Sequence, residues 1–316
     1  MNRLAPALLV ALLSWAWIGA AHAQSDRQQP DLTWSFDNAA PAWEKEAGPL
    51  IVLSTTQSAY VQRGSLDPFA RLAATDGFRI ARQQGDLGSG LGADTGILVI
   101  ANPYLASFRD FPAMEPPSAF SAEEIESIRR WVEDGGSLLL LADHAPFGGG
   151  SSLLAEAFGF TFLNGHALDE QAAAAGTVGV STRFIPKNGL QGALPTPVGS
   201  TARPPLDVFQ AFGGQAFIPA EGASNLLTIP QGWSAVFSYR IQAELTSAPR
   251  IDASGMSQGA TLEYGKGRIA VFGEAGAFTA QILDGSDRFG FNSREGAGNP
   301  DFVLATLRWL ARFEPR

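Results

Sequence analysis

Three runs of strand length in this sequence are apolar almost without interruption, and they restrict the fold more than any other feature. They are PLIVLST (49–55), TGILVIANP (95–103) and GSLLLLAD (136–143). A strand with one face in water alternates apolar and polar residues, whereas a strand that is covered on both faces does not. The runs therefore predict inner strands of a sheet that has other structure packed on both of its faces.

Helix signals separate these strands. The segment SAEEIESIRRWVEDGG (121–136) begins with a capping box, in which Ser121 and Glu124 each satisfy a backbone N–H group of the other, and it ends at Gly135. Fully apolar strands that alternate with helices through right-handed crossovers predict an α/β fold with a doubly wound, mostly parallel sheet. The other elements expected on this basis are helices at 66–78, 151–160 and 299–313, the last capped by Asn299, a strand at 78–82, and a hairpin with a buried strand within 262–276.

The character of the sequence changes between about residues 165 and 262. Short β-branched or aromatic segments are divided there by Gly and Pro, as in TVGVSTRF and AVFSYR. We interpret this region as an antiparallel, β-rich insertion in an α/β domain that spans 48–316. Residues 24–47 are polar and contain two tryptophans, and we expect them to form an extended arm that packs on the domain.

The first 23 residues have the layout of a secretory signal peptide. Arg3 precedes an apolar stretch (8–20), and AHA (21–23) is a small-x-small cleavage site. We expect a mature chain that begins at Gln24 and lies in the periplasm or outside the cell, with an uncleaved anchor as the alternative. No later run of the sequence approaches the length of a membrane span.

Composition excludes several kinds of partner and of chemistry. The chain has no cysteine, which removes disulfides, thiol nucleophiles and thiolate metal ligands. Its net charge is −9 at pH 7, and lysine and arginine form no cluster. This charge argues against nucleic acid or an anionic membrane as a partner. The sequence indicates no particular cofactor and no oligomeric state.

Asp143 and His144 are the first candidates for a chemical site. Asp143 ends the run LLLLAD and His144 follows it, at the carboxyl end of a predicted strand, which is where ligands bind in parallel sheets. A carboxylate and an imidazole in that position can ligate a divalent metal or act as acid and base. The structural alternative is an aspartate that caps the next turn and holds the histidine in place.

Two further residues could join this pair. Glu274 follows another buried strand, so we expect Asp143, His144 and Glu274 to converge; the alternative is that Glu274 caps a helix start. His166, in FLNGHALD, could add a ligand, although a single histidine of this kind is more often an exposed loop residue.

The segment APFGGGSSLLAEAF (145–158) places three glycines and two serines before a predicted helix. Backbone N–H groups in such a position favour an anion, and Gly149 and Ser151 are the candidates to bind it. The alternative, which we prefer, is a flexible turn with Ser151 or Ser152 as N-cap. The segment matches no Walker A, GxGxxG or GxSxG pattern, so nucleotide binding and a hydrolase elbow have no support.

Several segments, in order along the chain, are similar to a bacterial family known as domain of unknown function forty-three-fifty. They are the stretch 138–169, FGGQAF (212–217), MSQGAT (256–261), RIAVFGEAGAFTAQ (268–281) and FGFN (289–292). The resemblance covers about residues 49–313 and implies a class I glutamine amidotransferase-like, flavodoxin-like fold. The positions that match are Asp143, His144, Pro146, Phe147, Asn164, Gly165, Gly273, Glu274, Ala275, Gln281 and Asn292.

The resemblance excludes one reaction, and this sequence departs from the family at one segment. Amidotransferases of this class use a strand-end cysteine, so a chain without cysteine cannot hydrolyse glutamine through a thiol. The first strand of the family commonly leads into an acidic, histidine-rich segment. Here that place reads VLSTTQSAYVQRG (52–64), without Asp, Glu or His, so a metal site held there would be incomplete.

Two functions are consistent with these observations. The first, which the incomplete segment favours, is non-catalytic binding of a small polar ligand, with carbohydrate as one class. The second is a periplasmic hydrolase-like enzyme that uses Asp143, His144 and Glu274, with or without a divalent metal. The candidate binding residues are Phe147, Gly149, Ser151, Asn164, Gln281 and Asn292. Five aromatic residues of the insertion would suit sugar stacking, although a core position is the preferred interpretation; they are Phe209, Phe212, Phe217, Trp233 and Tyr239.

Overall fold

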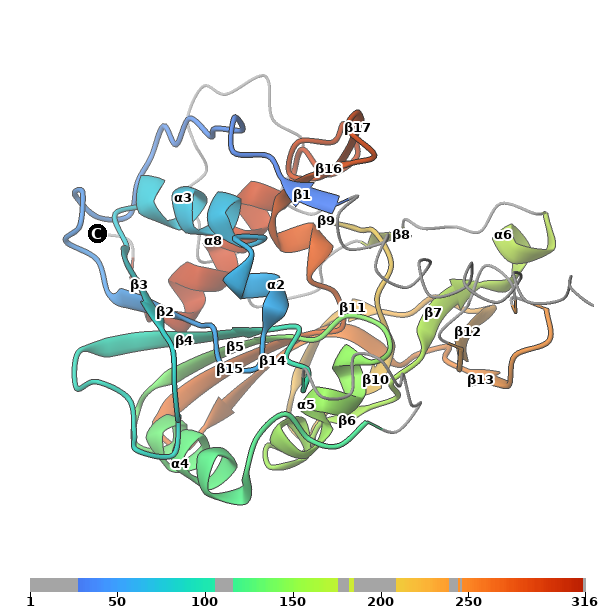
Figure 1. The fold of residues 1–316 in the computed structure, drawn as a ribbon, viewed down its shortest axis with the longest axis horizontal. Coiled ribbons are helices and arrows are strands. Elements are labelled where there is room, and N and C mark those ends of the chain that lie inside the picture. Colours follow the sequence, from blue (N-terminus) through green and yellow to red (C-terminus); the bar gives the residue numbers. More distant parts are fainter. Residues whose placement is uncertain are drawn as a thin grey trace, which may run out of the picture.

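A computed structural model gives the fold (Figure 1) and describes residues 28–105, 116–175, 182–184, 209–238, 244 and 246–314. The predicted signal peptide (1–23) and Tyr239 lie outside the described residues. The largest sheet has nine strands, in the order β3-β2-β4-β5-β15-β14-β10-β6, with β11 also paired to β14. Their bounds are β2 (Leu50–Ser54), β3 (Arg79–Gln83), β4 (Thr95–Ala101), β5 (Ser137–Leu141), β6 (Thr161–Phe162), β10 (Phe217–Ile218), β11 (Ser224–Thr228), β14 (Ser257–Tyr264) and β15 (Gly267–Phe272).

One side of this sheet is parallel and contains the apolar runs. Strands β3, β2, β4, β5 and β15 are hydrogen-bonded in that order, all in the same direction. Successive leucines of β5 face opposite ways. Leu138 and Leu140 belong to one buried cluster, and Leu139 and Leu141 belong to another. The run has no polar residue because each of its two faces fills a core.

The other side of the sheet is antiparallel. A tight hairpin at Gly265 and Lys266 joins β14 to β15, and β10, β6 and β11 continue in antiparallel pairs. Three smaller sheets are also antiparallel: β1 (Gln28–Pro30) with β16 (Ala280–Leu283) and β17 (Asp287–Gly290), β7 (His166–Asp169) with β12 (Trp233–Val236) and β13 (Arg250–Asp252), and β8 (Thr182–Phe184) with β9 (Phe209–Ala211).

The prediction of a doubly wound, mostly parallel sheet is therefore wrong. In the described part of the chain nine strand pairings are antiparallel and four are parallel. The reason is that the region expected as a separate insertion supplies strands β10, β11 and β14 to the main sheet itself. A strand that enters through a tight hairpin must run antiparallel to its neighbour.

Four helices pack on the sheet. In Figure 1, α3 (Asp67–Thr75) and α8 (Asn299–Leu310) lie on one face, and α4 (Ala122–Glu133) lies on the other; α5 (Phe147–Glu156) follows β5. The predicted capping box of Ser121 and Glu124 is confirmed at the start of α4. The shorter elements are α2 (Ala59–Gln62), α6 (Glu170–Ala174) and the 3₁₀ turn η2 (Gly276–Phe278). Among the described residues, no helix has the length and apolar character needed to cross a membrane.

Two predicted helix starts are wrong. Helix α5 begins at Phe147, with Pro146 at the N-cap, so the three glycines lie inside the helix and neither Ser151 nor Ser152 caps it. Helix α8 has Gly298 at its N-cap. The side chain of Asn299 instead donates to the carbonyls of Gln210 and Ala277, so it joins neighbouring segments rather than capping its own helix.

A buried ion pair between Asp76 and Arg308 joins the turn after α3 to α8, and both of its members also contact residues 38–42. Asp76, in the turn after α3, is 0% exposed and accepts hydrogen bonds from Arg308 Nε at 2.7 Å and from Asn38 Nδ2 at 2.9 Å. The N–H of Ala42 donates to the same carboxylate at 3.0 Å. Arg308 is itself only 2% exposed and also donates to the carbonyl of Ala40. Residues 38–42 are thus held against the domain by one charged pair.

Candidate functional site

Asp143 and Glu274 occupy equivalent positions at the ends of two neighbouring parallel strands. Leu141 of β5 is in register with Phe272 of β15, and each carboxylate follows two residues later. The structure therefore brings the two predicted acids to the same edge of the sheet, close enough for the charge of Asp143 to affect the pKa of Glu274. We call the region around Asp143, His144 and His166 the Asp143 surface.

Glu274 is 1% exposed, and the backbone occupies both of its oxygens. Oε1 accepts the N–H groups of Gly276 at 2.6 Å and Ala277 at 3.3 Å, and Oε2 accepts the N–H of Phe212 at 3.1 Å. Burial and the charge of Asp143 raise the pKa of Glu274 to about 8, although these three donors act in the opposite direction. The contacts match the alternative role, a cap at the start of η2, and leave no oxygen turned toward a substrate.

Asp143 is more accessible, with a side chain that is 18% exposed. Its Oδ1 accepts the N–H of His144 at 2.8 Å, whereas its Oδ2 accepts no hydrogen bond from any residue that the structure describes. The backbone of Asp143 is fixed on both sides: its N–H donates to Asn102 Oδ1 at 2.9 Å, and its carbonyl accepts from Gln215 Nε2 at 3.0 Å. The result is a rigidly placed carboxylate with one oxygen left over.

The imidazole of His144 turns away from Asp143. Its Nε2 lies 4.0 Å from Asp143 Oδ1, beyond hydrogen-bonding distance, and its Nδ1 lies 2.9 Å from the carbonyl of Ala145. The ring stacks instead on His166, with ring centroids 4.4 Å apart and planes inclined by 20°. The Asp-His acid–base pair that the sequence suggested is not formed in this geometry.

His166 is a strand residue rather than an exposed loop residue. It begins β7, and its Nε2 lies 3.0 Å from the carbonyl of Ser238. Burial, and to a smaller extent the proximity of His144, lower the pKa of His166 to about 3. His166 is therefore neutral at physiological pH, and it serves as a flat aromatic support for the half-exposed ring of His144.

Gln281 and Asn292 bond to other residues of the protein, and among the described residues neither forms a hydrogen bond with Asp143 or Glu274. Gln281 Nε2 donates to the hydroxyl of Tyr60 at 2.8 Å, and Asn292 Nδ2 donates to the Gln281 carbonyl at 3.0 Å and to Asp31 at 2.9 Å. Tyr60 is buried, and burial together with the charges of Asp143 and Glu274 raises its pKa. These polar groups are therefore occupied by contacts within the protein, and they support the site rather than face a ligand.

The glycines of α5 are explained by close packing. A Cβ at Gly148 would lie 2.3 Å from Gln215 Nε2, and one at Gly150 would lie 2.5 Å from the carbonyl of Pro103. Gly149 donates its N–H to Asn164 Oδ1 at 2.8 Å. Ser151 is 0% exposed, and its Oγ has no hydrogen-bond partner among the described residues. Side chains and backbone of the protein thus fill the space where the sequence suggested an anion. Phe147, at the start of α5, lies beside the Asp143 surface, with the centroid of its ring 6.2 Å from that of the His144 ring.

Two glutamines with a part in the site were not singled out from the sequence. Gln215 donates to the carbonyls of Ala142 and Asp143 and accepts the N–H of Asn164 at 2.8 Å, so it joins three segments. Gln258 donates to the Gly213 carbonyl at 2.8 Å. The segments FGGQAF and MSQGAT contain both residues. Neither glutamine stands at a predicted strand end, so no signal in the sequence separated them from other polar residues.

The remaining candidates have simpler roles. Phe209 and Phe217 are 0% exposed and Trp233 is 8% exposed. Phe209, Phe212 and Trp233 pack in one buried cluster and Phe217 packs in the other, so the core interpretation holds for these four aromatic residues. Among the described residues, no group of three or more His, Cys, Asp or Glu side chains is arranged to hold a metal ion. A cavity of about 360 Å³ lies at the amino ends of the parallel strands, away from Asp143.

Comparison with known proteins shows a similar fold in solved structures but does not assign the chain to a family. No family model and no curated protein matches the sequence. The structure is similar to the mmIFT52 N-terminal domain, with 13% identity over 84% of this chain and 99% of that chain and a TM-score of 0.50. It is less similar to the cytoplasmic protein STM1381 from Salmonella typhimurium LT2 (13% identity, 84% and 100% of the chains, TM-score 0.43). For the cold-adapted β-galactosidase from Rahnella sp. R3 the identity is 12%, the coverage 85% and 32%, and the TM-score 0.43.

Proposed function

We propose that this chain binds a small, neutral ligand rich in hydroxyl groups at the Asp143 surface, and that carbohydrate is the class of ligand that fits best. The observation that carries this proposal is the Asp143 carboxylate, which is mostly buried and rigidly held and yet keeps Oδ2 unused among the described residues. A carboxylate held in this way is an acceptor without a donor, and a ligand hydroxyl supplies the donor.

The surroundings of Asp143 suit such a ligand. The half-exposed His144 ring, stacked on neutral His166, offers a flat face for the C–H side of a sugar ring, with Phe147 beside it. An anionic ligand would meet the charge of Asp143 at short range, and a chain with a net charge of −9 as a whole. A neutral ligand avoids this repulsion.

A hydrolase is the second candidate, and the raised pKa of Glu274 beside Asp143 is the observation that favours it. A carboxyl group whose pKa is raised toward neutral pH is typical of a general acid. The three backbone donors on Glu274 oppose this function, because a general acid needs an oxygen that can reach the substrate. We therefore place binding before catalysis.

We also propose that the protein works after export and that it belongs to the family forty-three-fifty. Support for both comes from the sequence: the signal-peptide layout of residues 1–23 and the ordered matches between 138 and 292. The mass of the exported protein is expected to correspond to a chain that starts at Gln24. A chain that retains residues 1–23 would contradict cleavage.

The binding proposal predicts a loss of affinity in Asp143→Asn. The change removes the charge, and a hydrogen bond to a charged group is worth about 1.5–3 kcal/mol, so the affinity should fall about tenfold or more. We would screen monosaccharides and disaccharides by saturation-transfer NMR and measure the best binder by calorimetry. Asp37→Asn, which makes the same change at an exposed residue, is the matched control. Equal affinities of the wild type and Asp143→Asn would refute the site, and turnover of a sugar that Glu274→Gln abolishes would favour the hydrolase.

A further inference from the structure

The cavity at the amino ends of the parallel strands has the features of a second binding site. Its walls come from residues that precede or begin β2, β4 and β5 and from the last turns of α4 and α8. Its volume of about 360 Å³ lies in the range of small-molecule sites. Asp143 follows the other end of β5, so this cavity is separate from the Asp143 surface.

Three hydrogen-bond donors line the cavity, each on a different element. The indole Nε1–H of Trp131 and the hydroxyl of Thr95 have no hydrogen-bond partner among the described residues. Arg312 uses part of its guanidinium on the Lys266 carbonyl and forms no ion pair with any residue that the structure describes. Burial and the charge of Arg268 lower the pKa of Arg312, with Glu263 acting weakly in the opposite direction. Two donors of this cavity therefore lack an acceptor among the described residues, and the exposed guanidinium of Arg312 has donor groups to spare beyond its bond to Lys266.

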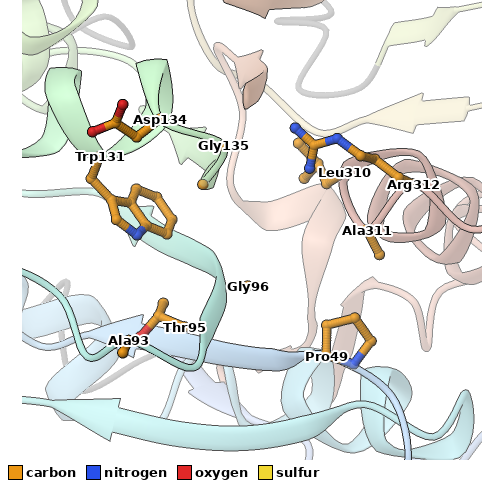
Figure 2. A pocket seen from close by; sticks show the side chains of 11 residues that line it. Pro49, Ala93, Thr95, Gly96, Trp131, Asp134, Gly135, Leu310, Ala311 and Arg312 are labelled. Atoms are coloured by element: carbon orange, nitrogen blue, oxygen red, sulfur yellow. The ribbon is translucent and has the colours of Figure 1, made fainter. Parts of the chain in front are cut away.

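Apart from the three donors and Asp134, the residues that line the cavity are glycine, alanine, proline and leucine. Figure 2 shows Trp131 and Thr95 on one side of the hollow, and Pro49 and Ala311 on the other. The indole lies so close to Gly136 that a Cβ at that glycine would be 2.3 Å from the ring, which fixes the ring position. Asp134 is the acid of this lining, and in Figure 2 its carboxylate points away from the hollow.

We propose that this cavity binds a small organic monocarboxylate with an aromatic or branched apolar body. A carboxylate offers only acceptors, which is what Trp131 and Thr95 lack, and the guanidinium of Arg312 is a group that recognises a carboxylate well. The apolar body would lie between the indole and Pro49. Helices α4 and α8 both end at this cavity, and the negative ends of their dipoles disfavour an anion, so the charge of Arg312 has to outweigh them and each further negative charge on the ligand adds to the repulsion. One negative charge is therefore the best match.

Benzoate is a suitable probe, with benzyl alcohol as its neutral counterpart. Titration of the full mature chain, followed by saturation-transfer NMR and calorimetry, should give a benzoate dissociation constant of about 1 mM or tighter. Benzyl alcohol should bind about tenfold more weakly. Arg312→Ala should weaken benzoate about tenfold. Thr95→Val, which keeps the shape of the side chain, and Trp131→Phe, which keeps an aromatic ring but a smaller one, each remove one donor and should weaken benzoate about two- to fivefold.

Two controls make the outcome decisive. Arg294→Ala removes the same charge from an exposed arginine outside the cavity, and Asp143→Asn alters the Asp143 surface; benzoate affinity should be unchanged in both. If Arg312→Ala fails to fold, Thr95→Val and Trp131→Phe still test the site. The proposal is overturned if benzoate does not bind at tens of millimolar, or if it binds equally well to all three cavity variants.

Discussion

Arg308→Ala should lower the free energy of unfolding by about 3–5 kcal/mol, because the change leaves the buried carboxylate of Asp76 without its cation. Asp76 is 0% exposed, and its other donors, Asn38 and the N–H of Ala42, are uncharged. A loss of this size is a large part of the total stability of a domain. It should lower the melting temperature by roughly 6–20 °C.

Thermal and denaturant unfolding of the purified chain would measure this loss. The matched control is Arg130→Ala, which breaks an exposed pair with Glu126 at 3.2 Å, in which the two side chains are 65% and 46% exposed. An exposed helix pair of this kind contributes about 0.3–0.5 kcal/mol, so the control should unfold almost as the wild type does. Similar small losses in both variants would mean that the Arg308–Asp76 pair does not hold residues 38–42 to the domain.

Glu274→Gln should change how stability depends on pH. The pKa of Glu274 is raised to about 8 from an ordinary value of 4.5, so between these values the folded chain keeps a proton that the unfolded chain loses. The favourable effect of the neutral form is complete below about pH 4.5 and is lost as the pH rises to about 8. Relative to the wild type, the glutamine variant should therefore gain stability across this window, by at most about 1.4 kcal/mol per pH unit.

Melting temperatures of both chains at several pH values between 5 and 8 would test this effect. The difference between variant and wild type should grow by at most about 3–5 °C per pH unit. In the background of Asp143→Asn the growth should be smaller, since the charge of Asp143 contributes to the raised pKa. A difference that does not vary with pH would show that Glu274 is already ionised in the folded chain, held by its three N–H donors.

Local features of this fold could be predicted where the signal lies in adjacent residues. The leucines of β5 indicated burial on both faces, and Ser121 and Glu124 indicated the start of α4. The places of β10 and β11 in the main sheet could not be predicted, because these strands pair with β14 and β6, which are far away from them in the sequence. The start of α5 was missed because three glycines disfavour a helix, and only the neighbours that pack against them explain it.

The same division applies to the candidate site. The strand ends placed Asp143 and Glu274 side by side, as sequence reasoning expected. The orientation of His144 depends on His166, which reaches it only because β7 pairs with β12. Tyr60 came from a segment that offered no acid or histidine, and its contact with Gln281 joins residues far apart in the chain. Contacts of this kind cannot be predicted from the sequence of either of the two segments that form them.

The position of β15 has a consequence for how the chain reaches its native state. This strand lies between β5 and β14, yet it comes late in the sequence, and Ile269 pairs with Leu138. Until β15 has been synthesised and has paired with β5, β5 is an unpaired, apolar edge strand that can pair with other molecules. Pairing across so long a stretch of chain is also slow. A nascent or truncated product that stops before residue 267 should therefore need a chaperone or aggregate.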